Sequence, residues 1–217
     1  MIELDRESDV FVLRMRDGEN RFSLNWLDQV NVALNRVQAT EGPIALVTVG
    51  EGKFYSNGMD LDWLASAPER AGEYLQMIYR VLGRVLSLPV ITVAAVNGHA
   101  FGGGAQLAIA HDFVVMRADR GYWCMPEADL GLALTPEYMS LLSAKLTGRT
   151  LHEALVTGRR YGGADALAAG IVHQIASEDE VLPQAIKLAA ELAGKHRPTL
   201  AEHKRLLYGD AIKALVG

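Results

Sequence analysis

The stretch VNGHAFGGGAQLAIAHD, from Val96 to Asp112, decides which fold the sequence predicts. It carries three consecutive glycines, Gly102 to Gly104, between an apolar run and a helical pattern. Glycine loses more backbone freedom on folding than other residues, so a triplet needs a structural reason. One reason is a tight packing turn between a strand and a helix. The other is a loop whose bare N–H groups stabilise negative charge.

The segments around the glycines predict alternating strands and helices. Short apolar runs predict buried strands, and apolar residues spaced by three and four predict helices. The expected strands are 10–15, 44–49, 90–96 and 113–116, and the expected helices are 23–37 with Ser23 as N-cap, 75–86, and one from Leu107 onward. This alternation indicates an α/β fold with parallel strands joined by helical crossovers. From Thr135 onward the chain is predicted to be mostly helical, with Pro136 in a first turn.

The composition excludes several classes of protein. The chain has 217 residues, is 50% hydrophobic, and carries a formal charge of −5 with no basic run, so nucleic acid is not expected as a partner. The single cysteine, Cys124, excludes an internal disulfide and indicates a reducing compartment. No signal peptide or membrane-length apolar segment is present, so we expect a cytoplasmic protein that does not interact with membranes.

The pattern around the glycines narrows the choice of ligand. The dinucleotide fingerprint G-x-G-x-x-G and the phosphate-binding G-x-x-x-x-G-K-[ST] are both missing. A second loop, GKFYSNGMDLDWL at 52–64, also follows a predicted buried strand. Parallel strands end at the same edge of a sheet, where such sheets bind ligands, so the two loops should converge. An oxyanion hole built from the N–H of Met59 and one from the glycine triplet is then reasonable.

Four motifs in order carry a resemblance to a known family. FYSNGMDL, VAAVNGHAFGGGAQLAIAHDFVVM, MPEADLGL and TGRRYGGADALAAGIVHQI resemble the signatures of the crotonase, or enoyl-CoA hydratase/isomerase, family, and the match runs from about residue 8 to about residue 207. The resemblance implies a spiral of ββα units, acyl-CoA substrates, an enolate intermediate and a homotrimer or hexamer. It implies that Met59 and Gly103 donate the two N–H groups. The substrate-binding residues that we predict with them are Ser56, Asn57, Gly58, Asp60, Gly102 and Gln106.

The acidic residues predict which reaction is catalysed. Glu127 follows Pro126 in an apolar setting, which raises a carboxyl pKa toward the range useful for acid–base catalysis. Within the resemblance, Glu127 matches the catalytic glutamate. Family hydratases use a second glutamate where this chain has Gln106, and an amide cannot accept a proton at neutral pH. The sequence therefore resembles the Δ3,Δ2-enoyl-CoA isomerases most closely, with Glu127 as the one proton shuttle.

Other readings of these residues remain open. Asp129 and Glu137 are less favoured acids, and His99 and His111 show no triad or metal-ligand spacing, so no metal is expected. Trp63, Trp123 and Tyr55 are more typical of core than of an acyl pocket. The alternatives to an isomerase are a hydratase, a thioester hydrolase and a non-catalytic CoA-binding scaffold. No cofactor is expected, because the thioester group of the acyl-CoA substrate already supplies the activation that the reaction needs.

The resemblance also predicts how the chain divides. We expect a core at 1–150 that holds the acyl-CoA site. We expect a mainly helical region at 151–217 that packs on the core or on a neighbouring subunit. Family members commonly continue further after this point, so the C-terminal region is expected to be shortened. What then closes the acyl pocket is left open.

Overall fold

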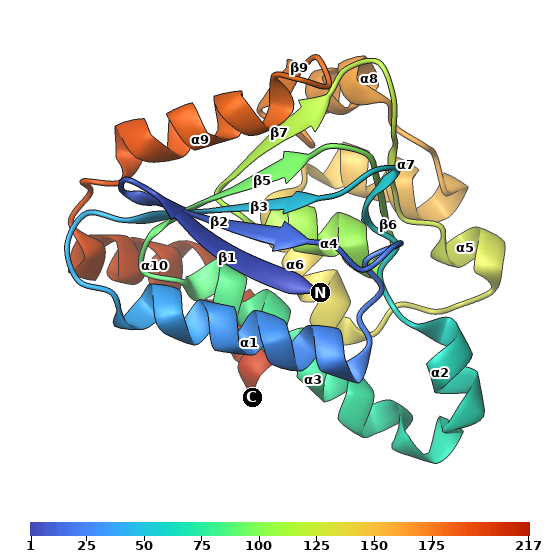
Figure 1. Cartoon of the computed structure of the whole chain (residues 1–217). Helices are drawn as coiled ribbons and strands as arrows, with labels where there is room; N and C mark the ends of the chain where they lie inside the picture. The colour runs from blue at the N-terminus through green and yellow to red at the C-terminus, as the bar shows by residue number, and fades with distance from the viewer.

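The computed structural model describes all 217 residues, which form an α/β fold (Figure 1). The strands are β1 (Ile2–Glu7), β2 (Val10–Met15), β3 (Ala45–Gly50), β4 (Phe54–Ser56), β5 (Ile91–Val96), β6 (His99–Phe101), β7 (Phe113–Arg117), β8 (Trp123–Cys124) and β9 (Gln174–Ala176). The α-helices are α1 (Leu24–Ala39), α2 (Leu61–Ser66), α3 (Ala71–Ser87), α4 (Gly103–Ala110), α5 (Glu127–Leu130), α6 (Pro136–Lys145), α7 (Gly148–Thr157), α8 (Gly163–Ala168), α9 (Val181–Leu192) and α10 (Arg197–Val216).

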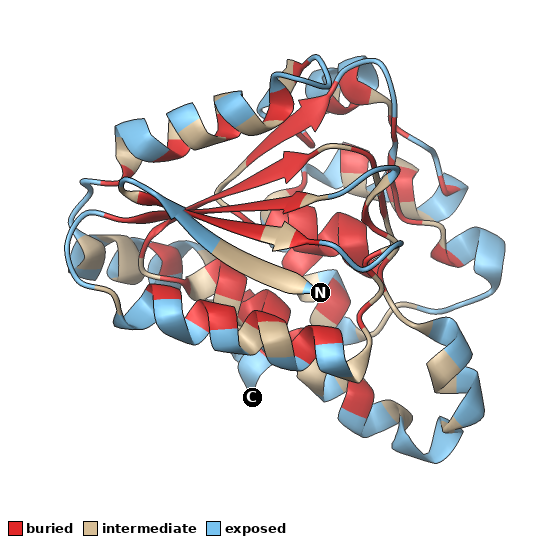
Figure 2. Cartoon of the chain, in the orientation of Figure 1, coloured by how far each residue is buried: buried red, intermediate tan, exposed pale blue.

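The main sheet has six strands in the order β1-β2-β3-β5-β7-β9. β1 pairs antiparallel with β2, and every other neighbouring pair is parallel. Successive residues of a strand point to opposite faces, so Val10 and Val12 join one apolar cluster while Phe11 and Leu13 join the other. Both faces are covered, which explains why β5 is buried at every residue and its neighbours β3 and β7 are buried at all but one (Figure 2).

Helices cover the two faces of the sheet unequally. α9 lies alone across one face and contacts β2, β3, β5, β7 and β9. On the other face lie α1, α3, α4 and α10, and α10 packs mainly on α3 and α6. The larger apolar cluster lies on this second side, and it includes both faces of α4, whose eight residues are all buried. A helix apolar on every side is typical of a protein interior.

A second sheet of three short strands, in the order β4-β6-β8, turns away from the first. Each of its strands directly follows one strand of the main sheet, so that β3-β4, β5-β6 and β7-β8 form repeating pairs, each followed by helix. The chain turns between the two sheets where backbones touch. A Cβ on Gly50 would lie 2.2 Å from Phe54 O, and a Cβ on Gly98 would lie 2.2 Å from Lys53 O. The predicted spiral of ββα units is therefore present.

The sequence predicted most of the main sheet. The four predicted strands are confirmed to within one residue at each end, as is the Ser23 N-cap, whose hydroxyl accepts a hydrogen bond from Trp26 N–H. Two helices begin four residues earlier than predicted: α3 begins at Ala71, not at residue 75, and α4 begins at Gly103, not at Leu107. Glycine disfavours helix, but here the close approach of another backbone leaves no room for side chains.

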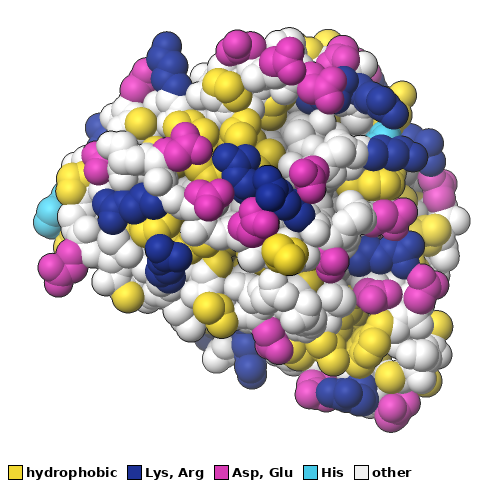
Figure 3. Space-filling model, viewed as in Figure 1, with side chains coloured by type: hydrophobic (Ala, Val, Ile, Leu, Met, Phe, Trp, Pro, Cys, Tyr) yellow, Lys and Arg dark blue, Asp and Glu magenta, His cyan; other side chains and the backbone are white.

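The region after residue 150 packs on the rest of the chain. It is mainly helical, and it also supplies β9, which pairs with β7 at the edge of the main sheet. The division into two domains at residue 150 stays a prediction. None of the helices has the length and apolar character needed to cross a bilayer. On the face drawn in Figure 3, basic and acidic side chains are interspersed, and hydrophobic side chains gather beside α2.

A buried lysine joins α10 to the main sheet. The Lys204 ammonium donates to Leu88 O and Val90 O, both at 2.9 Å, and to Asp112 Oδ2 at 2.7 Å. Lys204 is only 4% exposed, so its three donors are all satisfied inside the protein. Removing one member of a buried ion pair leaves the other charge without a partner.

We expect Lys204→Met to lower the free energy of unfolding by about 3 to 5 kcal/mol, because Asp112 and two carbonyls lose their partner. The neighbouring Arg205 is the control, since its pair with Glu202 is exposed on the same helix. Arg205→Ala should change the unfolding free energy by less than about 0.5 kcal/mol. Urea denaturation of both variants measures the difference. Equal losses would contradict the proposed role of Lys204 as the anchor of α10.

Candidate functional site

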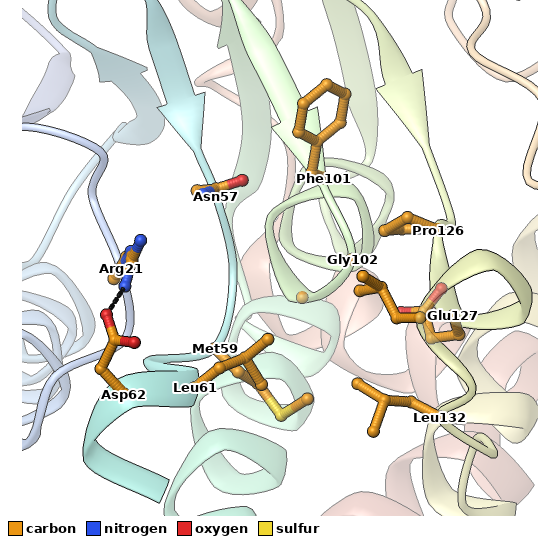
Figure 4. Close-up of a pocket in the computed structure, with 12 residues that line it drawn as sticks. Arg21, Asn57, Met59, Leu61, Asp62, Phe101, Gly102, Pro126, Glu127 and Leu132 are labelled. Atoms are coloured by element: carbon orange, nitrogen blue, oxygen red, sulfur yellow. Dashed lines mark hydrogen bonds and ion pairs between the residues drawn. The ribbon is translucent and has the colours of Figure 1, made fainter. Parts of the chain in front are cut away.

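The two loops that the sequence singled out meet at one cavity of about 360 Å³. The residues that line this cavity come from the segment before α1, from the loop before α2 and the first turn of α2, from the end of β6 and the start of α4, and from α5 and the residues on either side of it (Figure 4). The lining residues are Arg21, Asn57, Met59, Leu61, Asp62, Phe101, Gly102, Gly103, Pro126, Glu127, Leu130 and Leu132. Met59 and Glu127 approach the cavity from opposite walls.

The loops contact each other backbone to backbone. Gly58 has a φ of +75°, and a Cβ there would lie 2.6 Å from Gly103 N. A Cβ on Gly104 would lie 2.1 Å from Ser56 O, and one on Gly103 would lie 2.8 Å from the Phe22 ring. Side chains cannot fit at such distances. The glycines are therefore required by the close packing of the two loops as well as by the cavity.

Two backbone N–H groups on this wall have no partner within the chain. Around Met59, the N–H of Gly58 donates to Ser56 Oγ at 3.1 Å and that of Asp60 donates to Tyr74 Oη at 2.8 Å, but that of Met59 donates to nothing. The N–H of Gly103, the first residue of α4, is likewise unpaired, because a helix leaves its first N–H groups free. Both residues line the cavity, and neither N–H is used in a hydrogen bond of the chain itself.

Glu127 lies opposite these donors at the start of α5. Gly102 has a φ of +52°, and a Cβ on it would lie 3.3 Å from Glu127 Oε1, so the carboxylate stands directly over the glycine loop. Glu127 is 9% exposed and its Oε2 has no hydrogen-bond partner. Burial raises the pKa of its carboxyl above the ordinary range, and a hydrogen bond with its own backbone offsets part of the rise. Such a group is suited to take and return a proton.

The structure brings five of the predicted site residues to the cavity, and they are Asn57, Met59, Gly102, Gly103 and Glu127. Ser56, Gly58 and Asp60 do not line it. The Ser56 hydroxyl donates to Asn20 O at 2.7 Å, and the Asp60 carboxylate accepts from Trp63 N–H as the N-cap of α2. These three residues hold the conformation of the loop through hydrogen bonds within the protein. Their contact with a substrate stays a prediction.

Gln106 is buried within α4 and is not among the cavity-lining residues. It is 1% exposed, and its Oε1 has no hydrogen-bond partner. An unpaired buried amide oxygen is uncommon and needs an explanation such as a bound ligand or water. Its predicted role in binding a substrate stays a prediction.

The less favoured acids and histidines lie outside the cavity. Asp129 is exposed, with its carboxylate against Gly158, and Glu137 is in the first turn of α6.

His111 is fully buried, with Nδ1–H donating to Leu107 O and Nε2 bonded to the Thr48 hydroxyl. Burial lowers the pKa of His111 to about 4, so the ring is neutral. His99 packs among Phe54, Phe101 and Tyr122. The aromatic residues Tyr55 and Trp123 are core residues, as the sequence favoured.

Sequence reasoning missed several lining residues. Arg21 lies at the mouth of the cavity, where its guanidinium donates to Glu19 at 2.7 Å and to Asp62 at 2.6 Å. No local motif marks Arg21, which is more than thirty residues from the nearest glycine loop. Leu130 and Leu132 could have been found, because they follow Glu127 within the motif MPEADLGL. All three leucines, Leu61, Leu130 and Leu132, line the cavity and are exposed, and Figure 4 shows Leu132 and Leu61 on opposite sides of it.

The chain is similar to known proteins over nearly its whole length. Residues 5–215 match the family model described as enoyl-CoA hydratase/isomerase. The chain is 36% identical over 207 residues to the peroxisomal enoyl-CoA delta isomerase 2 of Arabidopsis thaliana, covering 90% of this chain and 86% of the relative. It is 34% identical over 175 residues to the carnitinyl-CoA dehydratase of Citrobacter koseri, covering 81% of this chain and 67% of the relative.

Solved structures agree with these matches. The apo structure of an enoyl-CoA isomerase from Mycobacterium tuberculosis superposes with a TM-score of 0.91 at 27% sequence identity. The superposition covers 99% of this chain and 93% of that protein. The α/β spiral is therefore shared with this protein from end to end of the present chain.

The burial of Glu127 predicts a measurable effect on stability. Its pKa is higher in the folded protein than in the unfolded chain, so its contribution to stability is fully present at low pH and is lost as the pH rises through the folded pKa. We expect Glu127→Gln to be more stable than the wild type at pH 8, with the difference shrinking toward pH 4. Thermal unfolding across this range measures it. Glu41→Gln, at an exposed site, is the control. A difference for Glu127→Gln that does not change with pH would contradict the raised pKa.

Proposed function

Because this chain belongs to the enoyl-CoA hydratase/isomerase family, we propose that it is an isomerase that converts a 3-enoyl-CoA into the 2-trans-enoyl-CoA. One observation carries the proposal: two unpaired N–H groups, on Met59 and Gly103, and one buried carboxylate, on Glu127, line the same cavity. The similarity to enoyl-CoA delta isomerases supports the same choice.

In the proposed reaction, the thioester carbonyl oxygen accepts hydrogen bonds from Met59 N–H and Gly103 N–H. The Glu127 carboxylate removes a proton from C2, and the electron pair of that C–H bond moves toward the carbonyl to give a dienolate. The two N–H groups stabilise the negative charge on its oxygen, and they are fixed before the substrate arrives. Glu127 then returns its proton to C4, the double bond lies between C2 and C3, and no water is consumed.

The setting of Glu127 supports its use as the single base. Its carboxylate is buried with one oxygen unpaired, so it is free to take a proton, and burial raises the pKa toward the working range. The other carboxylate that lines the cavity, that of Asp62, is highly exposed and paired with Arg21. With an amide at Gln106, the second carboxylate of a two-glutamate hydratase is missing from this chain.

The cavity suits an acyl-CoA in its other parts. Leu61, Leu130 and Leu132 offer an apolar surface at the mouth for an acyl chain. Arg21 also lines the cavity, and its guanidinium is shared between Glu19 and Asp62. The proposed chemistry needs no cofactor, because the thioester itself acidifies C2. Assembly as a trimer or hexamer and a cytoplasmic location stay predictions.

One specific observation favours a second candidate. The carnitinyl-CoA dehydratase of Citrobacter koseri is 34% identical to this chain, which supports addition or removal of water as the alternative reaction. Thioester hydrolysis and acyl-CoA binding without turnover are further alternatives within the fold. All of them use the same oxyanion hole, so only the reaction itself distinguishes them.

A substrate comparison tests the proposal. We expect the wild type to convert a 3-enoyl-CoA into the conjugated product, seen as rising absorbance of the enoyl thioester, and to leave a 2-enoyl-CoA unhydrated. Hydration of the 2-enoyl-CoA at a comparable rate would favour the dehydratase-like reaction. Release of free thiol would indicate a hydrolase, and binding with no turnover of either compound would indicate a scaffold.

Replacing the base tests the mechanism. We expect Glu127→Gln to lower kcat for isomerisation by roughly a hundredfold to ten-thousandfold, because general base catalysis contributes about that much. Binding of the acyl-CoA should persist, since the amide keeps the shape of the side chain. Asp129→Asn is the control, because Asp129 is exposed and does not line the cavity. Undiminished turnover by Glu127→Gln would remove Glu127 from the mechanism.

A further inference from the structure

A buried tyrosine hydroxyl connects the segments behind the oxyanion hole. Tyr74, on α3, is 1% exposed and does not line the cavity. Its hydroxyl oxygen accepts a hydrogen bond from Asp60 N–H at 2.8 Å, and the same hydroxyl donates to Phe22 O at 2.9 Å. One oxygen atom therefore joins the loop before α2, the segment before α1, and the body of α3.

Both partners of Tyr74 adjoin a proposed donor. The N–H that donates to the Tyr74 hydroxyl belongs to the peptide between Met59 and Asp60. This peptide follows directly after the one that carries the unpaired N–H of Met59. Phe22 N–H donates to Gly58 O at 2.8 Å, which fixes the other side of Met59. The Phe22 ring also lies against the second donor, since a Cβ on Gly103 would be 2.8 Å from its Cε2.

These contacts determine how the Met59 N–H is oriented. The peptide that carries this N–H accepts a hydrogen bond from Phe22 N–H at Gly58 O. The peptide before it donates from Gly58 N–H to Ser56 Oγ, and the peptide after it donates from Asp60 N–H to Tyr74 Oη. An oxyanion hole stabilises charge well only if its donors are fixed in advance, so that no reorganisation is needed during the reaction. A displacement of about 1 Å at such a site can lower the rate by roughly a hundredfold.

We propose that Tyr74 is a positioning residue of the oxyanion hole, whose hydroxyl holds the Met59–Asp60 peptide and Phe22 so that the N–H groups of Met59 and Gly103 point at one oxygen. This inference rests on the proposed function, because it assumes that these two groups bind the thioester carbonyl. Burial raises the pKa of Tyr74 to about 12, so the hydroxyl keeps the proton that it donates to Phe22 at physiological pH.

Tyr74→Phe removes this oxygen and keeps the ring, which packs on Trp63 at a centroid distance of 4.9 Å. Tyr79→Phe is the matched control. Tyr79 lies on the same helix, and its buried hydroxyl is bonded only to the Thr135 hydroxyl at 2.7 Å. Each variant therefore loses one buried phenol oxygen, but only Tyr74→Phe loses a contact with the loops of the hole. Circular dichroism and thermal unfolding show that each variant is folded.

The readout is the polarisation of a bound thioester carbonyl. A 2,4-dienoyl-CoA absorbs at longer wavelength when hydrogen bonds draw electrons toward its carbonyl oxygen, and its double bonds are already conjugated. The red shift on binding therefore reports the hole directly. It is measured at saturating protein together with kcat and KM for the 3-enoyl-CoA. Loss of stability alone would not reduce the red shift of bound, folded protein.

We expect Tyr74→Phe to show a smaller red shift and a kcat lower by roughly tenfold to a hundredfold, with KM changed by less than about threefold. Tyr79→Phe should keep the red shift and kcat of the wild type. A red shift and kcat for Tyr74→Phe equal to those of the wild type would overturn the inference, as would equal losses in both variants. If the wild type binds the dienoyl-CoA without any red shift, the oxyanion hole of the proposed function is itself wrong.

Discussion

A close contact between two backbones, at residues 56–58 and 102–104, holds the two loops of the site together. A Cβ at Gly58 or Gly104 would lie 2.6 Å or less from backbone atoms of the opposite loop, so only glycine fits. The two loops reach this contact because β3 and β5 are parallel neighbours and each leads into a strand of the small sheet. Next to this contact, the N–H groups of Met59 on one loop and of Gly103 on the other have no hydrogen-bond partner within the chain.

The buried carboxyl group of Glu127 is the second feature on which the proposed chemistry depends. Glu127 is held in a buried position over Gly102 with one oxygen unpaired, which raises its pKa and lowers the stability of the folded protein when the carboxylate is ionised. Folded proteins often carry such unfavourable groups where function requires them. Gln106, three residues after Gly103 on α4, is also buried, and its side chain is a neutral amide, which costs less to bury than a charged carboxylate would.

The sequence predicted what depends on local pattern and missed what depends on distant contacts. Four strands of the main sheet, β2, β3, β5 and β7, are largely apolar runs with clear ends, so they were found. The edge strands β1 and β9 were not predicted, because β1 is mostly charged and β9 has only three residues. The strands of the small sheet have only two or three residues, too few to show a period, and they exist because each continues a longer strand. The glycine triplet and Glu127 were found through their motifs. Arg21 was missed because only the fold brings it to the cavity.

A crystal structure of the Glu127→Gln variant with a bound 3-enoyl-CoA would show whether Met59 and Gly103 bind the thioester oxygen, because the variant should bind the substrate without converting it. We expect the thioester oxygen to lie roughly 2.7 to 3.1 Å from both Met59 N and Gly103 N, with C2 facing residue 127. A thioester oxygen bonded to neither group, or an acyl-CoA bound outside this cavity, would contradict it.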